Sequence, residues 1–170
     1  MDIDVFPDGR LVCGDVAVRC ALGATGVTRS KREGDKATPA GRFPLRRVLY
    51  RPDRIAPPAT ALPADPIGPQ DGWCDAPADP QYNRPVSLPY PASHERLWRE
   101  DHVYDIVVIL GYNDAPTVAG KGSAIFMHVA RPGYAPTEGC VALALPDLET
   151  VLARCGPGDS IRIHVAGAGS

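Results

Sequence analysis

Alternating apolar and polar side chains predict short strands at both ends of the chain. Ile3 and Val5 precede a Pro7-Asp8-Gly9 turn, and the alternation continues through residues 11–18 as a hairpin or meander. Residues 160–165 alternate in the same way near the C-terminus. The two ends of the sequence are therefore expected to contribute to a sheet.

Continuous apolar runs predict buried strands in the second half of the chain. Residues 104–110 and 123–128 are apolar or β-branched almost throughout, which is typical of strands buried on both faces. Residues 42–50 also have the composition of a strand, and Pro44 favours an edge position because proline cannot donate a backbone hydrogen bond.

One helix is expected over about residues 146–155. Pro146 suits the first turn and Gly156 suits the C-terminal stop. The apolar positions between them recur at helical spacing: Leu148, Val151, Leu152 and Cys155. The order of elements predicts a mostly β fold with one helix packed on the sheets.

The length of 170 residues suits a single domain over 1–170. Glycine and proline, at 17 and 19 residues, are more frequent than in average proteins. The segment from about 51 to 92 contains 11 of the prolines, and we interpret it as a long ordered loop. A helical turn is expected at 93–99. Together these segments are expected to cover a functional site.

Composition and charge exclude several classes of function. The net charge of −2 gives no global attraction for nucleic acid, and the longest aliphatic run, residues 106–110, is too short to span a membrane. Five cysteines without a CxxC pair argue against a disulfide framework and a zinc site. No motif indicates another metal or a cofactor. The first residues lack the pattern of a secretory signal, so the protein is expected in the cytoplasm unless an export segment was removed.

A local basic stripe interrupts this charge balance. Residues 29–54 hold nine of the 18 basic residues against three acidic ones. The stripe lacks the interleaved aromatic residues of a nucleic-acid surface. It is either a solvated face or a surface for an anionic ligand.

A histidine and a cysteine form the strongest candidate for chemistry. His128 ends a predicted buried strand, and Gly139-Cys140 follows after a turn-rich loop. A neighbouring imidazole or a group of backbone amides makes a thiol a useful nucleophile. Gly139 would permit a close backbone approach, and the amides near it are natural donors to an oxyanion. A lone cysteine among apolar residues is, however, more often a packed core residue.

At these residues the sequence resembles the YkuD family of L,D-transpeptidases, whose signature is a histidine, a loop and then Ser/Thr-His-Gly-Cys. Here His128, Thr137, Gly139 and Cys140 match. A second family feature, Thr-Pro-x-Gly-x-Phe, is present at residues 38–43, and the resemblance spans about residues 25–165. It implies a β-sandwich or barrel-like fold.

Two residues depart from the family signature. Glu138 stands in place of the second histidine, and Ala142 in place of an arginine or asparagine. The loop from His128 to Cys140 is also shorter than usual for the family. The resemblance implies that the arginine helps to hold the site or the donor peptide, so its absence concerns donor specificity more than nucleophilicity.

The resemblance implies that Cys140 attacks peptidoglycan stem peptides to form a thioester, with His128 as its base and Gly139 in the catalytic turn. An amine would resolve the thioester by transpeptidation, or water by carboxypeptidation; a non-catalytic module that binds peptidoglycan fragments is the alternative. Carbapenems would be covalent inhibitors. The expected location is the periplasm or cell envelope if an export signal was removed. We expect a monomer.

Six further residues are candidates for substrate binding. They are Thr137, Glu138, Tyr112, Tyr134, Trp73 and His94. His94 and its neighbour Glu95 would line a substrate cleft or else be solvated on the surface.

Overall fold

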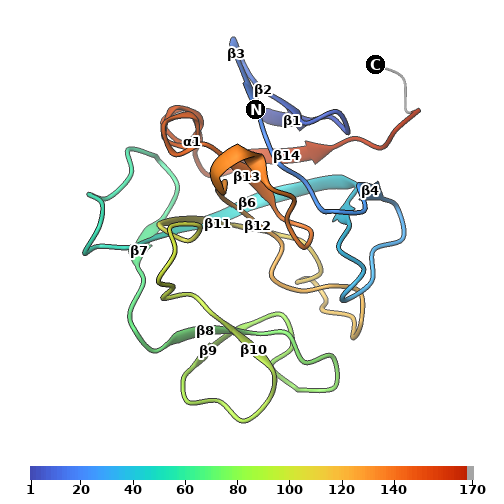
Figure 1. The fold of residues 1–170 in the computed structure, drawn as a ribbon, viewed down its shortest axis with the longest axis vertical. Coiled ribbons are helices and arrows are strands. Elements are labelled where there is room, and N and C mark those ends of the chain that lie inside the picture. The colour runs from blue at the N-terminus through green and yellow to red at the C-terminus, as the bar shows by residue number, and fades with distance from the viewer. Residues whose placement is uncertain (168–170) are drawn as a thin grey trace.

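The computed structural model describes residues 1–167, in which a nine-stranded, nearly closed sheet forms a barrel-like body (Figure 1). The sheet order is β13-β12-β11-β6-β14-β1-β2-β3, with β7 paired to β6. Its strands are β1 (Asp2–Val5), β2 (Arg10–Cys13), β3 (Val16–Arg19), β6 (Gly41–Tyr50), β7 (Ala64–Pro66), β11 (Ile106–Leu110), β12 (Phe126–Val129), β13 (Val141–Leu143) and β14 (Ser160–Ile163). The mostly β fold expected from the sequence is confirmed.

Strand β6 lies in the middle of this sheet, so the edge position expected from Pro44 is wrong. The first part of β6, through Pro44, pairs with β14, and the part from Leu45 to Tyr50 pairs with β11. Pro44 therefore lies where the strand changes partners. There its missing N–H costs little, while its carbonyl oxygen still accepts a hydrogen bond from the Gly111 amide.

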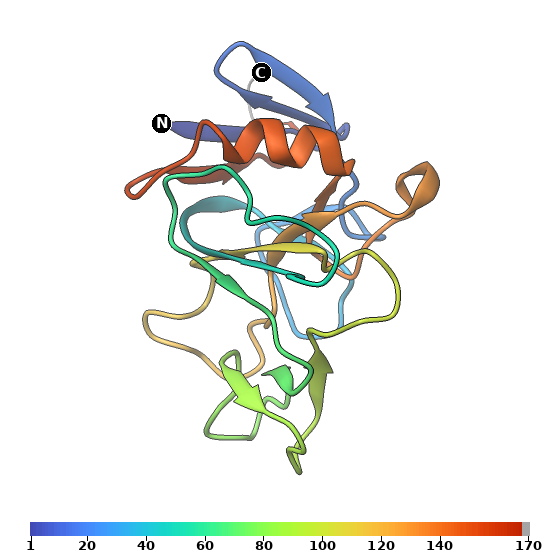
Figure 2. The ribbon, with the colours of Figure 1, turned by 90° about the vertical axis from the view of Figure 1, so that its left-hand side faces the viewer.

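The larger core lies between the sheet and the helix α1 (Leu145–Leu152), which packs against the upper part of the barrel (Figure 2). Leu148, Val151 and Leu152 are fully buried, as their helical spacing predicts. Proline stands in the first turn, as expected, but the helix ends three residues earlier than predicted. A short 3-10 helix, η1 (Pro132–Tyr134), lies in the loop before β13.

A smaller three-stranded sheet lies below the barrel in Figure 1 and corrects two expectations. Its strands are β8 (Asp71–Cys74), β9 (Pro85–Ser87) and β10 (His94–Arg96), in the order β10-β8-β9. Residues 51–92 are thus not a loop throughout, since they contain β7, β8 and β9. Residues 93–99 hold a strand rather than a helical turn, because the backbone N–H and C=O groups of β10 find their hydrogen-bond partners on the antiparallel strand β8.

A second apolar cluster joins this small sheet to the barrel. The Trp73 ring from β8 meets the edge of Phe126 from β12, with 5.1 Å between ring centroids. Leu97, Tyr104 and Cys140 belong to the same cluster. The small sheet therefore covers the part of the barrel where the predicted nucleophile lies.

Candidate active site

His128 and Cys140 line one cavity of about 480 Å³. Strands β12 and β13 are parallel, with His128 opposite Ala142, and Cys140 directly precedes β13. Side chains two residues apart on a strand share a face, so Cys140 points to the same side as Ala142, and Phe126 to the same side as His128. Because His128 lies opposite Ala142, the side chains of Phe126, His128 and Cys140 all point to one side of the sheet. Parallel pairing thus brings together two residues that are separated by twelve positions in the sequence.

The Cys140 sulfur is held by two backbone groups. Sγ accepts a hydrogen bond from the Phe126 amide at 3.3 Å and donates one to the Ala124 carbonyl at 3.2 Å. Burial, together with the negative charge of Glu95, raises the pKa of Cys140 to about 12, although the Phe126 amide and Lys31 act in the opposite direction. The free protein therefore holds a neutral thiol.

His128 is also neutral. Its Nδ1 lies 2.9 Å from the carbonyl oxygen of Val129, so Nδ1 carries the proton and donates, and Nε2 keeps the lone pair. Burial lowers the pKa of His128 to about 4. The orienting partner of the imidazole is thus the backbone carbonyl of Val129.

The turn before Cys140 requires glycine at position 139. Gly139 has φ of 141°, and a Cβ there would lie 2.7 Å from the Ala37 carbonyl oxygen. Its amide donates to Thr137 Oγ1 at 3.1 Å, so it is not free to bind an oxyanion as the sequence suggested. Within residues 1–167, the amide of Cys140 has no hydrogen-bond partner, and it is the donor of this turn that remains for an oxyanion.

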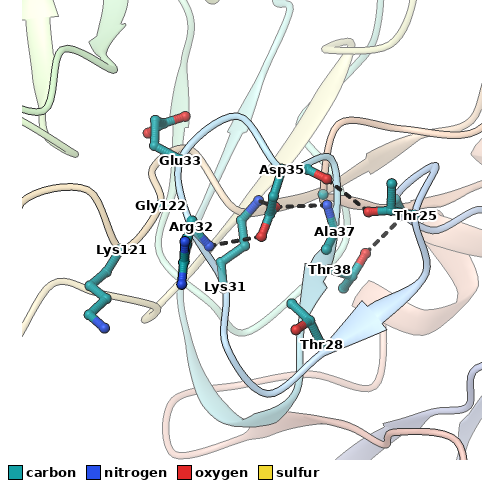
Figure 3. Close-up of polar contacts among 12 residues, drawn as sticks. Thr25, Thr28, Lys31, Arg32, Glu33, Asp35, Ala37, Thr38, Lys121 and Gly122 are labelled. Atoms are coloured by element: carbon teal, nitrogen blue, oxygen red, sulfur yellow. Dashed lines mark hydrogen bonds and ion pairs between the residues drawn. The ribbon is translucent and has the colours of Figure 1, made fainter.

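The loop that carries Lys31 forms another wall. The Lys31 ammonium is almost fully buried and pairs with Asp35 at 2.6 Å. Asp35 also accepts hydrogen bonds from the amides of Arg32 and Ala37, so it holds the loop in a tight turn (Figure 3). The Lys31 Nζ would lie 3.3 Å from a Cβ on Gly139, which places this cation beside the turn that leads into Cys140.

Glu95, on strand β10 of the small sheet, and Tyr104 complete the wall of the cavity. The buried Tyr104 hydroxyl donates to Glu95 Oε1, and the Tyr104 ring lies edge-on to His128 with 5.4 Å between centroids. Burial raises the pKa of Glu95 to about 7. A carboxyl group that titrates near neutral pH beside a nucleophile is a candidate for proton transfer.

The structure brings some of the predicted binding residues to this cavity and leaves others elsewhere. Thr137 and Glu138 line it. Trp73 and Tyr112 line a second cavity of about 230 Å³. Tyr134 lies under the guanidinium of Arg19 at 4.3 Å, and His94 Nδ1 contacts the Ala92 carbonyl at 2.8 Å.

Further residues that sequence reasoning did not place at the site also line the cavity, among them Lys31, Arg99, Tyr104 and Arg131. Lys31 was visible only as one member of a basic stripe, and Tyr104 only as part of a buried strand. Their role depends on contacts between segments far apart in the sequence, which no local pattern reveals.

Among residues 1–167, no three His, Cys, Asp or Glu side chains gather in a way that would hold a metal ion. The same part of the chain contains no helix that is long and apolar enough to cross a membrane.

Comparisons with known proteins place the chain in a family. A comparison with curated proteins found no match. An L,D-transpeptidase from Mycobacterium smegmatis is similar in structure, with 13% sequence identity and a TM-score of 0.41. The match covers 96% of this chain and 58% of that one. The sequence model of YkuD, the L,D-transpeptidase catalytic domain, matches residues 3–163. The chain therefore belongs to the YkuD family of L,D-transpeptidase catalytic domains.

Proposed function

We propose that this protein is a cysteine-dependent L,D-transpeptidase that acts on peptidoglycan stem peptides through a thioester. The observation that carries the proposal is that Cys140 and His128 line one cavity. A binding role alone would need neither a nucleophile nor a base.

The first step joins deprotonation to attack. Because the thiol and the imidazole are both neutral at rest, the proton moves from Sγ to Nε2 of His128 as the sulfur bonds to the carbonyl carbon of the donor peptide. The Cys140 amide stabilises the oxyanion. The C–N bond then breaks, and the leaving amine takes the proton from His128, which leaves a thioester on Cys140.

The second step resolves the thioester. An acceptor amine attacks the same carbonyl carbon, the C–S bond breaks, and the sulfur regains a proton through His128. Water in place of the amine gives carboxypeptidase activity from the same intermediate. The choice depends on which nucleophile the cavity admits.

The charges of the cavity suit a peptide that carries groups of both signs. Four acidic and four basic residues line it: Glu33, Asp75, Glu95, Glu138, Lys31, Lys36, Arg99 and Arg131. A stem peptide offers carboxylates to the bases and amines to the acids.

The test is incubation with a tetrapeptide muropeptide, followed by the mass of the intact protein and of the products. We expect an acyl adduct on the wild type and on Cys74→Ala, a buried cysteine outside the cavity, but none on Cys140→Ala. Carbapenem labelling should follow the same pattern. A folded wild type that forms no adduct with either compound would favour the non-catalytic binding module.

A further inference from the structure

Glu95 is a carboxylate without a cationic partner. Within residues 1–167, no lysine, arginine or histidine nitrogen lies within 4.0 Å of its carboxylate oxygens. Among the described residues, three of the four basic side chains that line the cavity are paired with aspartates: Arg99 and Arg131 contact Asp101, and Lys31 contacts Asp35.

The surroundings of Glu95 keep this carboxylate beside the sulfur. Glu95 is half-buried on β10, and the hydroxyl of Tyr104 fixes Oε1, which leaves Oε2 for another donor. Tyr104 in turn packs against His128, and Glu95 and Cys140 line the same cavity. A buried carboxylate is costly unless a cation or several hydrogen bonds compensate it. The protein supplies one hydroxyl, so the arrangement suits a positively charged ligand.

We infer that Glu95 receives the ammonium group of the amine acceptor and takes one of its protons before that amine attacks the thioester at Cys140. This role rests on the proposed transpeptidase function. It assigns the acceptor side of the cavity to the wall formed by β10 and Tyr104.

The proton balance of the step is complete. The ammonium gives one proton to the Glu95 carboxylate, and the resulting neutral amine bonds to the thioester carbon. As the C–S bond breaks, a second proton passes from the new amide nitrogen through His128 to the sulfur. The protonated Glu95 then releases its proton to solvent.

The titration of Glu95 suits this role. Burial raises its pKa, with Asp75 and Glu138 acting in the same direction and Tyr104 and Arg99 in the opposite one. A carboxylate with a raised pKa is a stronger base than an ordinary glutamate, yet it is still ionised in a large fraction of molecules near neutral pH.

The test compares wild type with Glu95→Gln, in which the amide keeps the volume and can still accept the Tyr104 hydrogen bond. The donor is a tetrapeptide muropeptide whose third residue carries a free amine, so that the same compound serves as acceptor. We measure the ratio of cross-linked dimer to hydrolysed product by mass. Glu149→Gln, which removes the same charge from an exposed position on α1, is the control.

We expect the ratio to fall about tenfold or more in Glu95→Gln, the effect of losing one charge-assisted hydrogen bond, and to stay unchanged in Glu149→Gln. Cross-linked dimer and hydrolysed product both form from the same acyl-enzyme, so a change in the acylation rate does not alter their ratio. Capture of the acyl-enzyme by hydroxylamine, which is largely uncharged at pH 7, should fall far less than transfer to the muropeptide amine.

Four outcomes would overturn the inference. An unchanged ratio in Glu95→Gln, or an equal loss of muropeptide and hydroxylamine transfer, removes the charge-based role while the acyl-enzyme proposal stands. A wild type that only hydrolyses its donor has the same consequence. A wild type that forms no acyl-enzyme at all overturns the proposed function and this role together.

Discussion

The Thr137 hydroxyl fixes the turn that leads into Cys140. Its Oγ1 donates to the Cys140 carbonyl oxygen at 2.7 Å and accepts from the Gly139 amide at 3.1 Å. The hydroxyl thus binds one backbone donor and one backbone acceptor of the turn. The Cys140 amide, in contrast, has no hydrogen-bond partner within residues 1–167.

Thr137→Val should destabilise this turn while keeping the side-chain shape. Two backbone groups lose their partner, so we expect the free energy of unfolding to fall by about 1–3 kcal/mol in a urea titration. The proposed acylation of Cys140 should slow as well. Thr150→Val, which removes an exposed hydroxyl from α1, should change stability by no more than about 0.5 kcal/mol. Equal effects of the two substitutions would contradict the role of Thr137.

Gly139→Ala should be more costly than Gly133→Ala, although both positions have positive φ. At Gly133 a Cβ meets nothing within 4 Å, so the cost is the backbone strain of about 1–2 kcal/mol. At Gly139 the Cβ also meets the Ala37 carbonyl oxygen, which adds about 1–3 kcal/mol of overpacking. Thermal or urea unfolding measures the difference. Similar losses at the two positions would show that the loop containing Ala37 yields to the methyl group.

Acid should destabilise the wild type more than His128→Gln. Burial lowers the pKa of His128 to about 4 in the folded protein, whereas the unfolded chain has an ordinary histidine. Between these values the unfolded state binds a proton that the folded state does not, so stability is lost as the pH falls. The difference in unfolding free energy between wild type and variant should change by about 3 kcal/mol from pH 7 to pH 4. Parallel pH curves for the two proteins would contradict a buried, neutral imidazole.

Alkylation of Cys140 by iodoacetamide should be slow at neutral pH and rise with pH well beyond the range of a free thiol. Burial raises the pKa of Cys140 to about 12, so the thiolate fraction should grow about tenfold per pH unit from pH 7 to 9. Peptide mapping after labelling gives the rate at each cysteine. The unfolded protein, whose thiols ionise with a pKa of about 8.5, is the control. A rate that levels off near pH 8 in the folded protein would indicate a solvated or activated thiol.

The sequence indicated the elements whose signals are local. The helix at Leu145–Leu152 follows from apolar spacing and Pro146, and the buried strand at Ile106–Leu110 follows from five consecutive apolar residues. The strand pattern failed where tertiary pairing decided the outcome, as at Pro44 in the central strand and at His94–Arg96 in the small sheet. Both segments depend on partners that lie far away in the chain.

The sequence by itself determined the family and the two candidate residues of the reaction, because a nucleophile, a base and a glycine turn are chemical requirements that residue types reveal. Only the tertiary structure decided the ionisation of His128 and Cys140 and the presence of Lys31, Glu95 and Tyr104 around them. The physical reason is that burial and the distances between charges set a pKa, and both arise from packing segments that are remote in sequence.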